Sequence, residues 1–115
     1  MHELSIAMSI VDMAEEEASR HHGRVTAVHL KLGPLSGVVK EALLGAFEMA
    51  REGSALADST LIVEEVAVTA YCPACAVERP IESFPELRCP TCGAPTPQVV
   101  HGRELEVVGL EIVEL

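Results

Sequence analysis

Apolar residues recur at intervals of three and four along the first part of the chain. One helical face would carry Leu4, Ala7, Met8, Val11 and Ala14. This period predicts a helix from Leu4 to about Arg20. More apolar residues flank that face, so we expect the helix to be covered on more than one side. Gly23 follows, and we expect it to end the helix in the left-handed conformation that glycine adopts most easily.

A period of two replaces the helical period between Val25 and Leu32. The two faces carry Val28, Leu30 and Leu32 on one side and Ala27, His29 and Lys31 on the other. This alternation predicts a half-buried strand. Gly33-Pro34 would end the strand, and Ser36-Gly37 offers an N-cap for a second helix. That helix would end at Gly53 and bury Val39, Leu43, Ala46, Phe47 and Ala50.

Two further strands are predicted, from about Leu61 to Val68 and from Glu104 to the end. In the last strand, Leu105 and Val107 share one phase, and Val108, Leu110 and Ile112 share the other. We therefore expect a bulge near Gly109. The whole pattern predicts an α+β fold in which two helices pack on a small three-stranded sheet.

The segment between these two strands has a different composition. Residues 71–97 contain all four cysteines and six of the seven prolines, with few large apolar residues. We expect this segment to be an inserted zinc-ribbon domain of residues 70–98. The α/β domain would then consist of residues 1–69 and 99–115.

Acidic side chains outnumber basic ones by 18 to 8, which gives a formal charge of −10. Such a surface repels phosphate backbones and anionic lipid, so we expect no nucleic acid and no membrane as a partner. The chain contains no run of about 18 apolar residues, and its start lacks the basic opening of a signal peptide. We therefore expect a cytoplasmic protein whose cysteines stay reduced.

The cysteines form two Cys-x-x-Cys motifs, the first knuckle (residues 72–75) and the second knuckle (residues 89–92). Zinc takes four ligands at the corners of a tetrahedron, and a two-residue spacer lets both cysteines of a knuckle reach one ion. We expect one structural Zn(II) ion bound by Cys72, Cys75, Cys89 and Cys92. Metal binding would also offset the shortage of apolar residues in this segment. Because all four ligands come from the protein, we expect no catalysis at this site.

Other chemistries also use paired cysteines. A reducing compartment argues against two disulfides, and a thioredoxin-like site has one such motif rather than two. The spacing leaves a four-cysteine iron–sulfur cluster open. A nucleic-acid-binding ribbon is disfavoured, because Arg79 and Arg88 are the only basic residues of this segment and Tyr71 and Phe84 its only aromatic ones.

Met1-His2-Glu3 is a second candidate metal site. The terminal amine of Met1, deprotonated backbone amides and the His2 imidazole can form a planar nitrogen set, which favours Ni(II) or Cu(II) over zinc. Glu3 would supply an oxygen ligand or a supporting hydrogen bond. A solvated histidine at a frayed terminus is the simpler interpretation from these three residues alone. His101 is a further candidate nickel ligand, and the remaining histidines read as polar surface residues.

Several motifs occur together in a fixed order along the chain. They are Met-His-Glu-Leu-Ser at the start, Gly-Pro-Leu-Ser-Gly at 33–37, Ala46-Phe47-Glu48, the two knuckles, and Gly102-Arg103-Glu104-Leu105. In this combination the chain resembles the HypA/HybF family of hydrogenase-maturation nickel chaperones. The resemblance implies nickel cargo at the N-terminus through His2, with Glu3 assisting, and zinc at the four cysteines. An acidic residue of the family near the start of the second helix is not matched, because position 40 is Lys40.

The resemblance also implies a function and partners. The protein would not be an enzyme; it would carry Ni(II) to the large subunit of a [NiFe]-hydrogenase, with a HypB-like maturation GTPase as a second partner. The competing hypothesis is a zinc-ribbon adaptor that binds a protein partner and transfers no nickel. Nickel titration into the zinc-loaded protein separates the two hypotheses.

Overall fold

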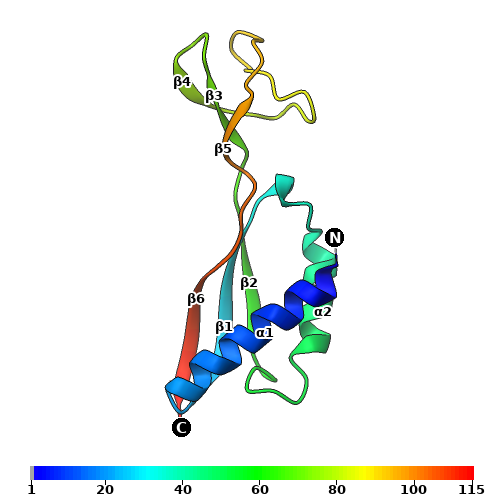
Figure 1. Cartoon of the computed structure of the whole chain (residues 1–115), viewed down its shortest axis with the longest axis vertical. Helices are drawn as coiled ribbons and strands as arrows, with labels where there is room; N and C mark the ends of the chain where they lie inside the picture. The colour runs from blue at the N-terminus through cyan, green and yellow to red at the C-terminus, as the bar shows by residue number, and fades with distance from the viewer. Residues whose placement is uncertain (1) are drawn as a thin grey trace. The chain divides into compact units, whose positions relative to one another are not determined.

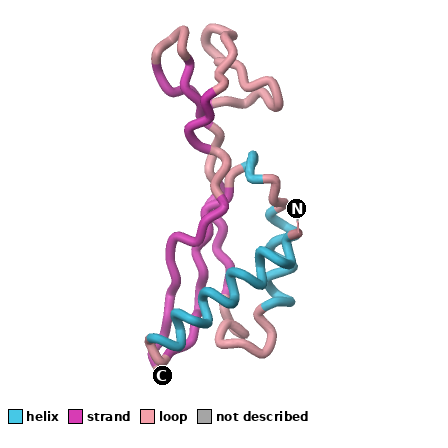
Figure 2. The backbone as a smooth tube through the Cα atoms, in the orientation of Figure 1, coloured by secondary structure: helices cyan, strands magenta, loops and turns pink. Residues whose placement is uncertain are grey.

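The structure is a computed structural model that describes residues 2–115. Its elements in chain order (Figures 1 and 2) are α1 (Glu3–Arg20), β1 (Gly23–Leu32), the 3-10 helix η1 (Pro34–Ser36), α2 (Lys40–Ala50), β2 (Thr60–Glu65), β3 (Thr69–Cys72), β4 (Val77–Pro80), β5 (Gln98–His101) and β6 (Leu105–Glu114). The chain forms two compact units. The first unit contains the described residues up to Lys31, Gly37–Glu64 and Glu106–Leu115, and the second unit contains Leu32–Ser36 and Glu65–Leu105.

Two helices and a three-stranded sheet build the first unit. The strand order is β2-β1-β6, and α1 packs against α2 while it crosses in front of the sheet in Figure 1. The core is aliphatic apart from Phe47, which is 1% exposed. Its other large and fully buried residues are Leu30, Leu43, Leu56, Val25 and Val28. The predicted α+β class, with two helices on a small three-stranded sheet, is confirmed.

In the turn after α1, Gly23 does not have the capping role that the sequence predicted. His22, with φ of 49°, takes the left-handed conformation, and Gly23 is already the first residue of β1. Gly23 is required for a close approach, because a Cβ there would lie 2.6 Å from the carbonyl oxygen of Val113. The Leu115 N–H also donates to the His22 carbonyl at 3.0 Å. The prediction that Gly23 caps α1 is therefore wrong.

The start of α2 also differs from the prediction. Ser36 belongs to η1, and α2 begins only at Lys40, with Val39 as its N-cap. No side-chain hydrogen bond from the cap residue closes the helix; the Val39 N–H donates to Oε2 of Glu3 at 3.2 Å. The predicted apolar stripe is also too broad, because Val39 is 57% exposed. A carboxylate from α1 replaces the local cap that the sequence suggested.

The strand predicted from about Leu61 to Val68 is shorter in the structure, where it runs from Thr60 to Glu65. β2 ends at Glu65, and β3 begins a new sheet at Thr69 with the order β4-β3-β5. Both pairs in this sheet are antiparallel, and the β3–β5 register shifts between Thr69 and Ala70. The second unit has a small apolar core, formed by Val68, Ala70 and Ile81 with Leu35 and Leu87 packed against them. Four short segments of chain therefore share one small core.

In β6, the burial pattern changes phase after Gly109, in keeping with the sequence pattern. Val108 was expected to share the face of Leu110 and Ile112, but it is 51% exposed while they are half-buried. The bulge itself remains a prediction. So does the division into domains 1–69 with 99–115 and 70–98.

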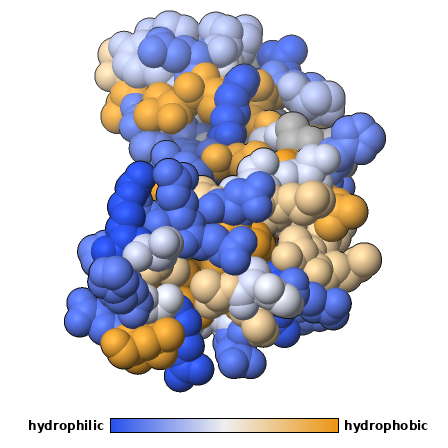
Figure 3. Space-filling model, turned by 60° about the horizontal axis from the view of Figure 1, so that its bottom comes forward, coloured by the Kyte–Doolittle hydropathy of each residue, from blue (hydrophilic) through white to orange (hydrophobic). Residues whose placement is uncertain are grey.

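Figure 3 shows charged and polar side chains over much of the face that it displays, with apolar patches between them. The most exposed large apolar side chains of the first unit are Leu115, Met49, Val39, Met8 and Val108. Within residues 2–115, neither helix combines the length and the apolar character that crossing a bilayer needs.

Candidate metal centre

The fold brings the four cysteines together in the second unit. Their sulfur atoms all lie within 4.8 Å of one another, and all four thiols are free. The Sγ atoms of Cys72 and Cys92 are 3.5 Å apart, and those of Cys75 and Cys89 are 3.9 Å apart. This is the set of residues that the sequence predicted as one metal site. Of the described residues, no other group of three or more possible ligands gathers in this way.

The two knuckles are built by the same turn. In the first, the Ala76 N–H donates to the Cys72 carbonyl at 2.7 Å, and Ala76 has a φ of 56°. In the second, the Gly93 N–H donates to the Cys89 carbonyl at 2.8 Å, and Gly93 has a φ of 76°. A left-handed residue after each knuckle thus folds its two cysteines toward the same point. β3 delivers the first of them, since it ends at Cys72.

The spacing of the sulfurs fits one tetrahedral ion. A zinc–sulfur bond of about 2.3 Å gives sulfur–sulfur edges of about 3.8 Å in a regular tetrahedron. The edges between Cys72 and Cys92, 3.5 Å, and between Cys75 and Cys89, 3.9 Å, lie on either side of that value. A disulfide needs about 2.05 Å, so neither pair is bonded. A cluster of several irons would hold its sulfurs farther apart, so the geometry favours a single ion.

The surroundings of Cys89 and Cys92 shift the pKa values of their thiols in opposite directions. The Cys92 N–H, followed by that of Thr91, donates to the Cys89 sulfur and lowers the pKa of Cys89 to about 6. Cys92 receives a stabilising hydrogen bond from the Ala94 N–H, but the neighbouring thiols raise its pKa to about 12. Four thiols packed this closely make full deprotonation costly until a cation is bound, because neighbouring thiolates repel one another.

At the N-terminus, His2 is exposed and is the N-cap residue of α1, with φ −90° and ψ 90°. Its side chain makes no capping hydrogen bond, and its carbonyl accepts from the Ile6 N–H at 3.2 Å. The terminal amine of Met1, a predicted ligand, lies outside the described residues. Glu3 is half-buried, and the Val39 N–H holds the pKa of its carboxyl below the ordinary value. The Glu3 carboxylate thus joins the starts of both helices.

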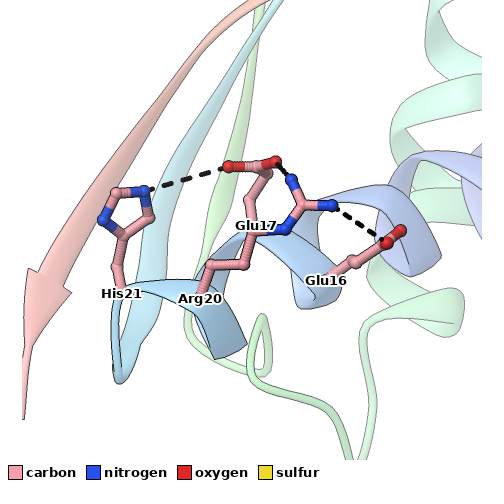
Figure 4. A network of polar contacts seen from close by, with 4 residues as sticks. All are labelled: Glu16, Glu17, Arg20 and His21. Carbon is pink, nitrogen blue, oxygen red and sulfur yellow. Dashed lines mark hydrogen bonds and ion pairs between the residues drawn. The ribbon is translucent and has the colours of Figure 1, made fainter.

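The C-terminal turn of α1 carries a small charge network (Figure 4). Arg20 lies between the carboxylates of Glu16 and Glu17, and His21 Nε2 is 3.9 Å from Glu17. His21 lies at this largely exposed helix end, as expected for a polar surface histidine. Glu15 differs from its neighbours, because its carboxylate accepts a hydrogen bond from a backbone N–H in the loop after α2.

Two other histidines also pair with single carboxylates. His29 Nε2 lies 2.6 Å from Glu111 of β6, and His101 Nδ1 lies 3.1 Å from Glu104. His29 is only half-buried, as expected for a strand residue on the polar face. His101 belongs to the second unit, and its role as a nickel ligand remains a prediction.

Comparison with known proteins identifies the family. A family model described as hydrogenase/urease nickel incorporation, metallochaperone, HypA matches residues 1–112. The chain belongs to the HypA family. The hydrogenase maturation factor HypA of Chloroflexus aggregans is 48% identical over 112 residues, which cover 96% of this chain and 98% of that protein. The HypA of Deinococcus radiodurans is 42% identical over 109 residues, which cover 93% and 89%.

Solved HypA structures share the fold. The solution structure of the Ni metallochaperone HypA from Helicobacter pylori has a TM-score of 0.67 and 25% identity, and the match covers 100% of both chains. A second HypA solution structure has a TM-score of 0.69 and 26% identity over 98% of this chain. The HypA family handles nickel for hydrogenase maturation and consists of metallochaperones rather than catalysts.

Proposed function

We propose that this chain binds Ni(II) at its N-terminus and delivers it to the large subunit of a [NiFe]-hydrogenase. The position of His2 at the start of α1 is the observation that supports this best. The helix bond from the Ile6 N–H to the His2 carbonyl leaves the N–H groups of His2 and Glu3 outside the helical ladder. Backbone amides there are free to deprotonate and join the imidazole and the Met1 amine around a square-planar ion.

Glu3 has a supporting role in this proposal. Its Oε2 is engaged by the Val39 N–H, so the carboxylate holds the start of α2 against the start of α1. The carboxylate is then fixed beside the proposed ligands, either to supply its other oxygen or to orient the His2 region. Glu3→Gln should weaken nickel binding less than His2→Ala, because the amide oxygen can still accept from Val39.

The four cysteines take one structural Zn(II) ion in the same proposal. When bound, zinc supplies four strong bonds that hold both knuckles in place, and it leaves no open coordination position for catalysis. The predicted partners, a HypB-like GTPase and the immature hydrogenase large subunit, rest on family membership. The acidic chain, with a formal charge of −10, favours partner surfaces with basic patches.

The test is a calorimetric titration of Ni(II) into zinc-loaded protein, followed by incubation with an immature large subunit. Wild type should bind nickel and pass it on, while His2→Ala should lose most of the binding and keep its fold. His21→Ala is the matched control, because His21 is an exposed histidine at the other end of α1. Equal nickel affinity in wild type and His2→Ala would remove the N-terminal site and favour the zinc-ribbon adaptor without nickel transfer.

A further inference from the structure

The outer face of α2 exposes apolar residues. Leu43 and Phe47 are the buried residues of this helix. On its other side Ala42, Gly45 and Met49 are exposed, and Met49 is 67% exposed. Residues three, four and seven positions apart share a face of a helix, so these three form one row, which we call the α2 row. The helix is therefore more apolar than its packing within the first unit requires.

The shape of the α2 row suits a second helix. A Cβ built on Gly45 would meet no atom within 4 Å, so the surface is low and open at the middle of the row. Val39, which is 57% exposed, lies just before the helix and extends the apolar surface beyond Ala42. The distance between two packed helices depends on the side chains at their contact, and small residues allow the closest approach. A helix laid on the row could thus come close to α2 and cover Met49.

Carboxylates without a partner lie beside the α2 row. Glu41 and Glu48 are seven residues apart and share one side of α2, and Glu52 follows at its end. All three are exposed, and within residues 2–115 none of them takes part in an ion pair or a side-chain hydrogen bond. The guanidinium of Arg51, between them in the sequence, donates to the Ser59 carbonyl. This side of the row therefore attracts basic side chains.

We propose that the α2 row is a docking surface for a basic amphipathic helix of a partner protein. Apolar side chains of that helix cover Ala42 and Met49, and its Lys or Arg side chains pair with Glu41 and Glu48. A second copy of this chain fits poorly, because it would bring the same carboxylates to the contact and a further formal charge of −10. None of these residues is a proposed metal ligand, and only the choice of proteins for the test rests on the proposed function.

The experiment measures the binding of the zinc-loaded full chain to a HypB-like GTPase and to an immature hydrogenase large subunit, each by calorimetry. The double variant Glu41→Lys/Glu48→Lys should weaken binding to one of them by about 10-fold or more, because two attractive pairs become repulsive. The control is Glu106→Lys/Glu114→Lys, which changes the net charge equally at exposed residues of β6 and should bind like wild type. Raising the salt concentration should reduce the difference between the two double variants.

A second variant tests the shape of the surface rather than its charge. Gly45→Leu adds a side chain where the structure has open space, and leucine favours a helix more than glycine does, so the Tm should not fall. The added side chain should nevertheless block a second helix and weaken the same binding by about 10-fold or more.

Nickel titration keeps this inference separate from the proposed function. All α2 variants should bind nickel as wild type does, whereas His2→Ala tests the nickel site alone. Affinities for both proteins that are unchanged in Gly45→Leu and in Glu41→Lys/Glu48→Lys would overturn the docking surface, as would a wild type that binds neither protein. A wild-type dimer in sedimentation that Gly45→Leu dissociates would also contradict it, because the occupant would then be a second copy.

Discussion

Two residues in the same left-handed conformation set the shape of the metal centre. Ala76 and Gly93 follow the two knuckles, and each donates its N–H back to the first cysteine of its knuckle. An L-residue in this conformation costs about 1–2 kcal/mol, whereas glycine adopts it freely. The first knuckle therefore carries a backbone strain that the second does not. This difference is testable because the turns are otherwise alike.

Ala76→Gly should stabilise the zinc-loaded protein, and Gly93→Ala should destabilise it. For Ala76→Gly the relief of strain exceeds the extra entropy of the unfolded chain, leaving a gain of about 0.5–1 kcal/mol. For Gly93→Ala we expect a loss of about 1–2 kcal/mol from the backbone alone, because a Cβ there meets no atom within 4 Å. Urea unfolding followed by Tyr71 fluorescence measures both. Changes of the same sign would contradict this account of the turns.

At the scale of elements, one carboxylate organises the connection between β5 and β6. Glu104 accepts from the Gly102 N–H at 2.7 Å through one oxygen and lies 3.1 Å from His101 Nδ1 through the other. The Gly102 carbonyl in turn accepts from the Leu35 N–H at 2.7 Å. A Cβ on Gly33 would lie 2.1 Å from that carbonyl oxygen, so only glycine allows the approach. The connection is thus held at several points within the second unit.

This carboxylate makes part of the stability of the second unit dependent on pH. The Gly102 N–H, helped by His101, holds the pKa of Glu104 below its ordinary value of 4.5. The stabilisation is therefore complete above pH 4.5 and is lost as the pH falls through the lower folded-state pKa. Glu104→Gln should be less stable than wild type at pH 7. The difference in the free energy of unfolding between the two proteins should become smaller in acid. Amide exchange at Gly102 and Leu35 measures the gap; a constant gap at all pH values would refute the assignment.

At the scale of the whole molecule, short-range sequence patterns predicted the features that depend on neighbouring residues alone. α1, β1 and the sulfur cluster follow from spacing alone, because a helix period, a strand period and a two-residue knuckle are all short-range signals. The errors come from partners distant in sequence. Glu3 of α1 accepts a hydrogen bond from the N–H of Val39 at the start of α2. Position 23 requires glycine because the backbone of Val113 in β6 comes so close to it.

The two units should also differ in their dependence on metal. The second unit relies on a small core around Val68, Ala70 and Ile81, whereas the first buries Phe47, Leu43 and many other apolar side chains. A core as small as that of the second unit does not offset the loss of chain entropy without added bonds. Removing zinc with a chelator should therefore unfold residues 71–97 and leave the helices and the β2-β1-β6 sheet folded.

Two spectroscopic signals can follow the unfolding of the two units separately. Tyr71 is its only tyrosine and it has no tryptophan, so intrinsic fluorescence reports on the second unit alone. Far-ultraviolet circular dichroism reports mainly on α1 and α2 of the first unit. Chelation should change the Tyr71 fluorescence and leave most of the helical circular dichroism signal. Added zinc should restore the original fluorescence. Leu43→Ala is the matched control: it should cost the first unit about 2–5 kcal/mol and leave the zinc-dependent fluorescence change intact. Loss of both signals at one chelator concentration would mean that residues 70–98 are not a separate folding domain.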